Sequence, residues 1–218
     1  MTPPGTDPPA EHEIAALRAL VRERRRALSG VARRAAEDAI ASHLLGLEQL
    51  SGGLDQAGRD AVEVGWYLAT DGEVDLAGAV DELRDRGHRL WLPVVGPDTT
   101  MSFRRWEPHT TLTPNRFGIP EPVAPAADPT IELPAERAAE RAASELDVVI
   151  VPSVALDRAG NRVGFGAGYY DRALAGAATT TIGVGFAIQL VEVLTPQPWD
   201  VTLDLVVTDD GVVRRGSA

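Results

Sequence analysis

The sequence predicts an α/β domain built around a mainly parallel β-sheet, and two features of its hydrophobic pattern support this. Residues 62–68 (VEVGWYL) and 89–95 (RLWLPVV) have the composition of strands, and residues 75–86 between them have the periodicity of a helix. A strand, a helix and a second strand in this order form a βαβ unit, whose strands pair in parallel. The other feature is a set of continuous apolar runs rich in β-branched residues, typical of fully buried strands: residues 146–152 (LDVVIVP), 179–186 (TTTIGVGF) and 201–208 (VTLDLVVT).

Composition and charge narrow the class of protein. The chain has 218 residues, 44% of them hydrophobic, and no apolar run that could span a bilayer, so we expect one domain with a substantial core and no membrane partner. Its net charge of -11 argues against nucleic acid as a partner. The absence of cysteine excludes disulfides and is compatible with the cytoplasm, the location that we expect. All 21 basic residues are arginine, which excludes a catalytic lysine.

The N-terminal part is interpreted from its proline content and its periodicity. Residues 1–10 (MTPPGTDPPA) hold four prolines and no core residue, so we expect a disordered tail followed by one domain over residues 11–218. Residues 11–28 repeat apolar side chains at helical spacing, and residues 31–50 continue as a second helix. Between residues 11 and 34 there are seven arginines and three acids, a net charge of +4 in an acidic protein. Such a run is either a solvated face or an arm that binds phosphate through guanidinium groups.

The middle of the chain contains one loop whose position suggests a ligand site. The loop between Leu68 and Asp75 follows the strand at residues 62–68, and open α/β sheets bind ligands at the carboxyl ends of their strands. Glu73 in this loop is either a ligand-binding carboxylate or an ordinary surface or capping acid. Three later residues are candidates for the pocket or for the core: Met101, Phe103 and Trp106. We expect an exposed connection at residues 123–133 and a short helix at residues 135–145.

A glycine-rich loop follows the apolar run that ends at Pro152. Residues 161–172 read NRVGFGAGYYDR, with glycines at 164, 166 and 168, and we expect the loop to lead into a helix at residues 169–178. Glycines let backbone amides approach an anion closely, although such a triplet is also typical of a flexible turn. The spacing matches neither the dinucleotide fingerprint nor the Walker loop. Asp171 is either a carboxylate that stabilises the start of the helix or a magnesium ligand beside phosphates.

The glycine loop resembles the signature of the 5-formyltetrahydrofolate cyclo-ligase family, which is Arg-x-Gly-x-Gly-x-Gly-Tyr-Tyr-Asp. The matching residues are Arg162, Gly164, Gly166, Gly168, Tyr169, Tyr170 and Asp171. The resemblance extends from residue 14 to residue 208, with further matches at Leu17, Arg18, Glu73, Val74, Asp75, residues 117–122 (FGIPEP), residues 189–191 (QLV), Pro198 and Asp200. It implies a three-layer α/β/α domain with a mainly parallel sheet.

The resemblance also implies an activity, in which ATP and Mg²⁺ are used to convert 5-formyltetrahydrofolate into 5,10-methenyltetrahydrofolate, ADP and phosphate. The implied catalytic residues are Arg162, Tyr169 and Asp171, and the implied magnesium ligands are Asp171 and Asp200. The implied ATP-binding residues are Ile14, Arg18, Arg162, Val163, Gly164, Phe165, Gly166, Ala167, Gly168, Tyr169 and Tyr170. The implied folate-binding residues are Arg18, Leu68, Glu73, Phe165, Gly166, Ala167, Gly168 and Tyr169. The expected partners are therefore two small molecules, and we expect a monomer.

One position departs from the family pattern. The first helix of the family reads Lys-x-x-Leu-Arg, and Ile14 stands at the lysine position. An apolar side chain cannot replace an ammonium group beside a phosphate, and Arg22, one turn beyond Arg18, is a candidate to do so. If nothing replaces the lysine, the alternative to the enzyme is a folate- or nucleotide-binding homologue that has lost turnover. A third interpretation is a different phosphotransferase on the same scaffold. Asp204, in the same C-terminal motif as Asp200, is either a site residue or a structural one.

Overall fold

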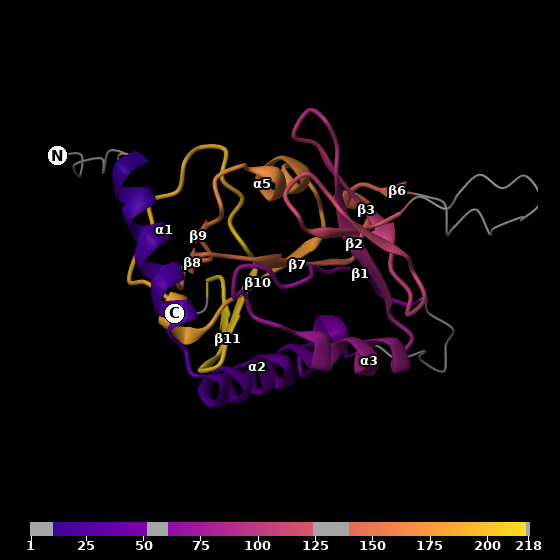
Figure 1. Cartoon of the computed structure of the whole chain (residues 1–218), viewed down its shortest axis with the longest axis horizontal. Coiled ribbons are helices and arrows are strands. Elements are labelled where there is room, and N and C mark those ends of the chain that lie inside the picture. Colours follow the sequence, from indigo (N-terminus) through magenta and orange to yellow (C-terminus); the bar gives the residue numbers. More distant parts are fainter. Residues whose placement is uncertain (1–10, 52–60, 124–139, 217–218) are drawn as a thin grey trace, which may run out of the picture.

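The computed structural model of the chain describes residues 11–51, 61–123 and 140–216, and Figure 1 shows their arrangement. The expected tail at residues 1–10 lies outside the described residues, as does the expected connection at residues 123–133 apart from Val123. Within the described ranges, no helix is both long enough and apolar enough to cross a bilayer.

Two consecutive helices form the N-terminal part of the fold. Helix α1 spans Glu11–Arg26 and helix α2 spans Gly30–Leu45. The Ser29 side chain between them caps α2 by accepting a hydrogen bond from the Ala32 amide at 3.2 Å. The second expected helix ends earlier than predicted, at Leu45, and a short 3-10 helix, η1 (Glu48–Leu50), follows.

An eight-stranded sheet lies at the centre of the fold. Its strands are β1 (Glu63–Gly65), β2 (Arg89–Val95), β3 (Met101–Arg105), β6 (Glu140–Arg141), β7 (Val148–Pro152), β10 (Thr180–Val184), β11 (Leu205–Thr208) and β12 (Gly211–Arg214). Their order is β12-β11-β10-β7-β1-β2-β3-β6. The five strands from β11 to β2 pair in parallel, and the edges are added by antiparallel pairing. Helix α3 (Ala77–Asp85) connects β1 to β2, which confirms the predicted βαβ unit.

Two short hairpins stand beside this sheet. Strand β4 (Leu112–Pro114) pairs with β5 (Pro120–Pro122), and β8 (Ala155–Leu156) pairs with β9 (Arg162–Val163). The second hairpin follows β7 and leads directly into the glycine loop and helix α5 (Tyr169–Leu174). The chain thereby brings the glycine loop to the carboxyl end of a central strand.

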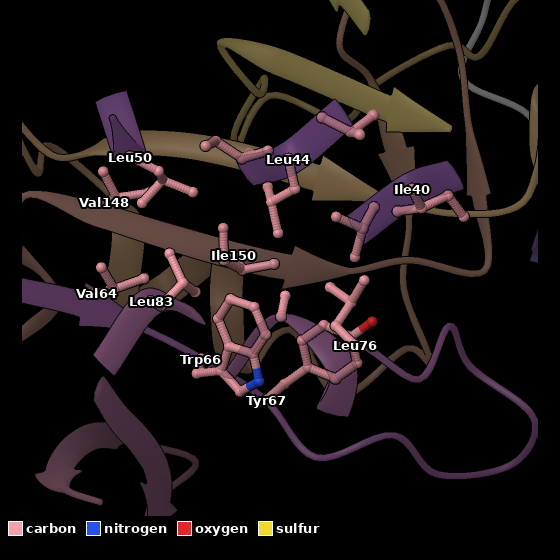
Figure 2. Close-up of a cluster of buried hydrophobic side chains, with 14 of the residues drawn as sticks. Ile40, Leu44, Leu50, Val64, Trp66, Tyr67, Leu76, Leu83, Val148 and Ile150 are labelled. Atoms are coloured by element: carbon pink, nitrogen blue, oxygen red, sulfur yellow. The ribbon is translucent and has the colours of Figure 1, made fainter. Parts of the chain in front are cut away.

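The core has two layers because side chains alternate between the two faces of each central strand. Val148 and Ile150 of β7 belong to the cluster beneath α2 and α3, whereas Val149 and Val151 pack in the cluster that contains Leu174 of α5. Figure 2 shows the first cluster, in which residues of the two helices meet the sheet: Ile40, Leu44, Leu83, Val64, Val148 and Ile150. Figure 1 likewise shows α2 and α3 on one side of the sheet and α5 on the other, which confirms the predicted three-layer fold.

The helix expected at residues 135–145 is wrong in its described part. Glu140–Arg141 forms the edge strand β6, paired with β3, and Ala143–Glu145 forms a 3-10 helix, η2. The Ser102 hydroxyl donates a hydrogen bond to the Glu140 carboxylate at 2.7 Å across this pair. Pairing with a neighbouring strand therefore outweighs the helix propensity of an alanine-rich segment.

Other expected elements are also shorter than predicted, such as the strand expected at residues 62–68, of which only Glu63–Gly65 forms β1. The helix after the glycine loop ends at Leu174, shortly before Gly176 adopts a left-handed conformation with φ of +70°. The strand expected at residues 201–208 begins only at Leu205. Just before it, the Asp204 carboxylate accepts hydrogen bonds from the Thr181 amide and hydroxyl, both at 2.9 Å, which supports the structural interpretation of Asp204.

A half-buried ionic network ties together the amino end of β1 and its neighbours. The Glu63 carboxylate accepts a hydrogen bond from the Trp91 indole at 2.5 Å. Guanidinium nitrogens of three arginines lie 2.8, 3.9 and 3.3 Å from it, and they belong to Arg89, Arg105 and Arg141. The Glu63 side chain is only 11% exposed, so its charge interacts with all three cations in surroundings largely shielded from water, while Arg105 also lies 3.8 Å from Glu107.

We expect Glu63→Gln to lower the free energy of unfolding by roughly 1–3 kcal/mol, since three guanidinium groups lose a counter-charge that is shielded from water. Urea unfolding at neutral pH measures this. The control is Glu82→Gln, which breaks a half-exposed pair with Arg86 at 2.9 Å on α3 and should cost no more than about 0.5 kcal/mol. Equal losses in the two variants would contradict the stabilising role of Glu63.

Candidate active site

The strand order reverses its direction between β1 and β7. From β1 the parallel strands continue through β2 on one side, and from β7 they continue through β10 and β11 on the other side. The connections that leave β1 and β7 therefore diverge, and open α/β sheets bind ligands in the crevice at the carboxyl ends of such strands. The loop that contains Glu73 follows β1, and the β8–β9 hairpin with the glycine loop follows β7. The structure thus brings both predicted ligand loops to one place.

Helix α1 lies across these two loops. The Arg18 guanidinium donates a hydrogen bond from Nε to the Gly164 carbonyl at 2.8 Å. One turn later, Arg22 Nε bonds to the Asp71 carboxylate at 2.6 Å, and its guanidinium carbon lies 5.7 Å from the centre of the Phe165 ring. The arginine run is therefore more than a solvated face, because it holds the helix on the loops that follow β7 and β1.

The opposite side of α1 is apolar and packs onto the β8–β9 hairpin. Ile14, Leu17 and Val21 join a cluster with residues that follow β7: Val154, Ala155, Val163 and Leu194. Figure 1 shows α1 beside β8 and β9. Ile14, which stands at the position where a lysine was expected, is thus a packing residue of this cluster.

The glycine loop adopts a conformation that requires glycine at two of its three positions. Gly166 and Gly168 have φ of +107° and +67°, which side chains rarely adopt. A Cβ at Gly168 would also lie 2.8 Å from a guanidinium nitrogen of Arg172. Helix α5 after the loop has only six residues, so its dipole is weak and cationic side chains must supply most of the positive charge at this site.

Arg162 and Asp171 form a buried ion pair beneath the glycine loop. The Arg162 Nη2 atom lies 2.6 Å from Asp171 Oδ1, and the two side chains are 4% and 16% exposed. The same Asp171 oxygen accepts a hydrogen bond from the Val201 amide at 3.2 Å, which ties the segment next to Asp200 to this pair. Arg162 Nε is buried and has no hydrogen-bond partner in the described part of the chain.

The two tyrosines at the start of α5 point to different surroundings. Tyr169 accepts a hydrogen bond from Arg116 of the loop between β4 and β5, and its ring meets the edge of Phe117 at a centroid distance of 5.9 Å. The Tyr170 hydroxyl is buried and makes no hydrogen bond to any described residue. Burial, together with the negative charge of Glu73, raises the pKa of Tyr170, so its hydroxyl stays protonated at neutral pH.

Glu73 is a buried carboxylate, which rules out the surface interpretation. The residue is 6% exposed and accepts hydrogen bonds from the Thr70 amide at 2.9 Å and the Thr70 hydroxyl at 3.2 Å. Burial raises the pKa of Glu73 in spite of these hydrogen bonds. Leu68, the other predicted folate residue of this loop, is partly buried against the main core cluster. A buried, polar-paired carboxylate at the carboxyl end of a strand is suited to orienting a ligand.

The segments that carry the predicted magnesium ligands Asp171 and Asp200 meet, because the Val201 amide bonds to Asp171. Asp171 and Asp200 offer carboxylate oxygens, the ligands that Mg²⁺ prefers. Asp171 Oδ1 is already bonded to Arg162, and one Asp200 oxygen accepts a hydrogen bond from the Gln197 amide at 2.8 Å. Over the described ranges, no group of three or more His, Cys, Asp or Glu side chains gathers. The predicted metal site therefore rests on two carboxylates, of which Asp171 is already paired with Arg162.

Several residues at the site carried no signal of their own in the sequence. Asp71 lies in an Asp-Gly turn with φ of +51°, and the turn was predictable although its three arginine partners were not. Arg25 is fully buried within a helix that looked amphipathic and charged.

Of the aromatic pocket candidates, Phe103 is fully buried in the core, and Trp106 packs against the main cluster with Arg84 4.5 Å from its ring.

Comparisons with known proteins agree on one family. The 5-formyltetrahydrofolate cyclo-ligase family matches residues 10–209. The 5-formyltetrahydrofolate cyclo-ligase of Haemophilus influenzae is 32% identical over 192 residues, which cover 86% of this chain and 92% of that protein. The enzyme of the same name from Escherichia coli K12 is 36% identical over 151 residues, 67% of this chain and 77% of that protein.

Two solved structures have the same fold. The NMR structure of the 5,10-methenyltetrahydrofolate synthetase of Aquifex aeolicus superposes with a TM-score of 0.73 at 29% identity and covers 94% of each chain. The corresponding synthetase of Mycoplasma pneumoniae superposes with a TM-score of 0.65 at 22% identity, over 90% of this chain and 99% of that one.

We expect Glu73→Gln to stabilise the fold at pH 7 by roughly 0.5–2 kcal/mol, the range common for a single stabilising substitution. Since the folded-state pKa of Glu73 is raised by burial, the charged form that prevails at pH 7 is unfavourable in the folded protein. The gain in stability should be present above the raised pKa. It should shrink as the pH falls toward 4.5, the ordinary pKa of this carboxyl, because the wild-type side chain then becomes protonated and neutral, like that of glutamine. Thermal unfolding from pH 4 to pH 8 checks this, and a difference that does not vary with pH would contradict the electrostatic cause.

Proposed function

The chain belongs to the 5-formyltetrahydrofolate cyclo-ligase family and is an enzyme of the ligase class; on this basis we propose that it uses ATP and magnesium to convert 5-formyltetrahydrofolate into 5,10-methenyltetrahydrofolate, ADP and phosphate. The observation that carries the proposal is the meeting, at the carboxyl ends of β1 and β7, of the glycine loop, Arg18, the Arg162–Asp171 pair and buried Glu73. We further propose that the enzyme is a cytoplasmic monomer that acts on small molecules alone.

The proposed reaction needs phosphoryl transfer because a formyl oxygen on an amide-like nitrogen is a poor leaving group. The γ-phosphoryl group moves from ATP to the formyl oxygen, which breaks one P–O bond and forms another. The neighbouring folate nitrogen then attacks the formyl carbon, forming a C–N bond and losing its proton. Phosphate departs as the C–O bond breaks, which leaves the methenyl bridge. The protein's task is to position the reactants and to balance charge.

The phosphate side of the site is formed by the glycine loop and arginines. Three residues of the loop are glycines without a Cβ atom, so their amides can approach a phosphate closely. Arg18 bonds to the loop at Gly164, and Arg162 lies next to the loop, paired with Asp171. The whole proposed ATP set is Ile14, Arg18, Arg162, Val163, Gly164, Phe165, Gly166, Ala167, Gly168, Tyr169 and Tyr170. Within it Ile14 contributes packing, and we assign the charge of the family lysine to Arg22, whose guanidinium lies over Phe165.

The folate side is formed by the loop after β1. Glu73 is positioned to accept hydrogen bonds from the folate ring, and Leu68 supplies an apolar wall, together with Arg18 and Tyr169 from the other loop. Asp171 and Asp200 would hold magnesium, which when bound offsets the charge that develops on the transferred phosphoryl group. Arg162 would orient Asp171, since the two side chains already form an ion pair at 2.6 Å.

A folate- or nucleotide-binding protein without turnover is the second candidate, and it is motivated by the apolar packing of Ile14. Calorimetry that detects tight folate binding by a preparation that forms no product would favour it. A phosphotransferase with another acceptor would instead consume ATP without forming the methenyl product.

The activity is tested directly by mixing the purified protein with Mg-ATP and 5-formyltetrahydrofolate. We expect the absorbance of the methenyl product to grow only when all components are present, because the ring cannot close until the formyl oxygen is phosphorylated. Omission of ATP and omission of Mg²⁺ are the controls. No ATP-dependent growth in absorbance would refute the proposed activity.

The two proposed metal ligands should respond differently to substitution. Asp200→Asn is expected to lower turnover by something on the order of a hundredfold or more, since loss of an electrostatic contact in a phosphoryl-transfer site is costly. Its stability should change little because asparagine can still accept from the Gln197 amide. Asp171→Asn should lose turnover to a similar degree and also lose roughly 1–3 kcal/mol of stability, since Arg162 is 4% exposed and loses its counter-charge.

Turnover at several Mg²⁺ concentrations and urea unfolding measure these two effects. The matched control is Asp204→Asn, a nearby aspartate bonded to Thr181, which should keep its magnesium requirement. Wild-type turnover by Asp200→Asn at limiting Mg²⁺ would show that the metal lies elsewhere.

A further inference from the structure

The function proposed so far uses only one member, Arg22, of a larger charged cluster at the site. Arg22, Arg25 and Arg26, all on α1, converge on the single carboxylate of Asp71. Resting on the proposed ATP-dependent activity, we propose that these arginines form an anion subsite of the active site, that Asp71 fills it as an internal counter-ion when no ligand is bound, and that a phosphate group of ATP takes its place.

The charges of the cluster leave it short of one anion. Arg22 Nε lies 2.6 Å and Arg25 Nη2 lies 3.3 Å from Asp71 Oδ2, and Arg26 bonds to the other oxygen. Three guanidinium groups therefore share the Asp71 carboxylate, and the charge of Glu73 acts on Arg25 as well, so two anions face three cations. The hydrogen bond from Arg22 is the main cause that lowers the pKa of Asp71, so this carboxyl is ionised at neutral pH. The Arg22, Arg26 and Asp71 side chains are 39%, 58% and 21% exposed, which makes the cluster accessible to a ligand.

The buried member of the cluster has unused hydrogen-bond donors. Arg25 is fully buried, and its Nε and Nη1 atoms have no partner in the described ranges. A buried guanidinium with two unpaired donors is costly unless another acceptor binds. Because these two atoms are themselves buried, Arg25 contributes mainly its charge, and Arg22 and Arg26 offer the exposed donors to an arriving phosphate.

The turn that carries Asp71 is anchored independently of its carboxylate. Arg25 Nη2 donates to the Asp71 carbonyl at 2.7 Å, and Arg33 Nη1 donates to the Gly72 carbonyl at 3.1 Å. These bonds hold the backbone of the loop against α1 and α2 whatever the Asp71 side chain does. The carboxylate can therefore leave the arginines without undocking the helix.

The position of the cluster favours phosphate as the incoming group. Arg22 lies over Phe165 of the glycine loop, and Arg18 on the preceding turn binds Gly164 of the same loop. The face of α1 that carries the cluster is thus continuous with the loop proposed to hold the phosphates of ATP. The glutamate carboxylate of the folate substrate offers the same anionic oxygen chemistry, so an experiment must separate the two sources.

The decisive variant is Asp71→Asn, because competition and simple stabilisation predict effects of opposite sign. If Asp71 competes with the ligand, removal of its charge should lower the Kd for Mg-ATP, measured by calorimetry, by about threefold or more. If Asp71 only fastens α1 to the loop, the Kd should stay the same or rise, and that result would overturn the proposal. Thermal unfolding of the variant verifies that it is folded under the conditions of the titration.

Arg22→Gln supplies an independent arm in case Asp71→Asn fails to fold. We expect it to raise the Kd for Mg-ATP about tenfold or more, as for the loss of one charge-assisted hydrogen bond. The matched control is Arg24→Gln, which removes the same charge from an exposed position of the same helix and should change the Kd little. Equal effects of the two substitutions would overturn the proposal in favour of long-range charge alone.

Titration with inorganic tripolyphosphate and, separately, with 5-formyltetrahydrofolate identifies the source of the anion. A phosphate subsite requires that Asp71→Asn tighten tripolyphosphate and leave the folate Kd unchanged. The reverse pattern would overturn phosphate as the ligand and assign the cluster to the folate carboxylate. The wild-type protein can form the methenyl product even if Asp71→Asn binds Mg-ATP no more tightly than the wild type. That outcome would leave the proposed function intact and refute the subsite.

Discussion

Parallel pairing of β1 with β7 is the constraint on which the site depends. The two strands are neighbours in the sheet but far apart in the chain, and the connections that leave them run in opposite directions. Their carboxyl ends therefore form the kind of switch point at which open α/β sheets bind ligands. The buried alternation of β7, with Val148 and Ile150 toward one helical layer and Val149 and Val151 toward the other, fixes this register. A slip by one residue would exchange the two sets between the layers and move the glycine loop away from Glu73.

Helix α1 turns this switch point into a site by contacting both loops at once. Its apolar side packs on the β8–β9 hairpin, while its arginines reach the Gly164 carbonyl and the Asp71 turn. Guanidinium groups suit this position because they are always charged and offer several donors in a fixed plane. The chain has no lysine, so every cationic contact at the site comes from arginine. Because arginines elsewhere on α1 supply the positive charge, the Ile14 side chain can pack in the apolar cluster.

The sequence was informative where local pattern and long-range structure agree. Local properties of the sequence predicted the βαβ unit, the buried strands and the glycine loop with Gly166 and Gly168. Periodicity indicates the strands and the helix, and the backbone freedom of glycine indicates the loop. The burial of Glu73 and the pairing of Arg162 with Asp171 were not, since they depend on which distant segments meet. The segment at residues 140–145 shows the opposite case, in which an alanine-rich helix pattern yields to pairing with β3. Likewise, the structural role of Asp204 depends on its hydrogen bond from Thr181, which lies on a neighbouring strand.

The two arginine clusters of this fold show why position must be added to chemistry before a site is inferred. Glu63 and Asp71 each hold three arginines, and each cluster contains buried guanidinium nitrogens without a partner among the described residues. Glu63 begins β1, and its arginines come from strands of the sheet whose register is fixed by the ladder. Asp71 follows β1, and its arginines come from one helix that also contacts the glycine loop. The two clusters thus carry similar charges but differ in place, because the Asp71 cluster lies beyond the carboxyl end of β1, where the connections diverge and open α/β sheets bind ligands.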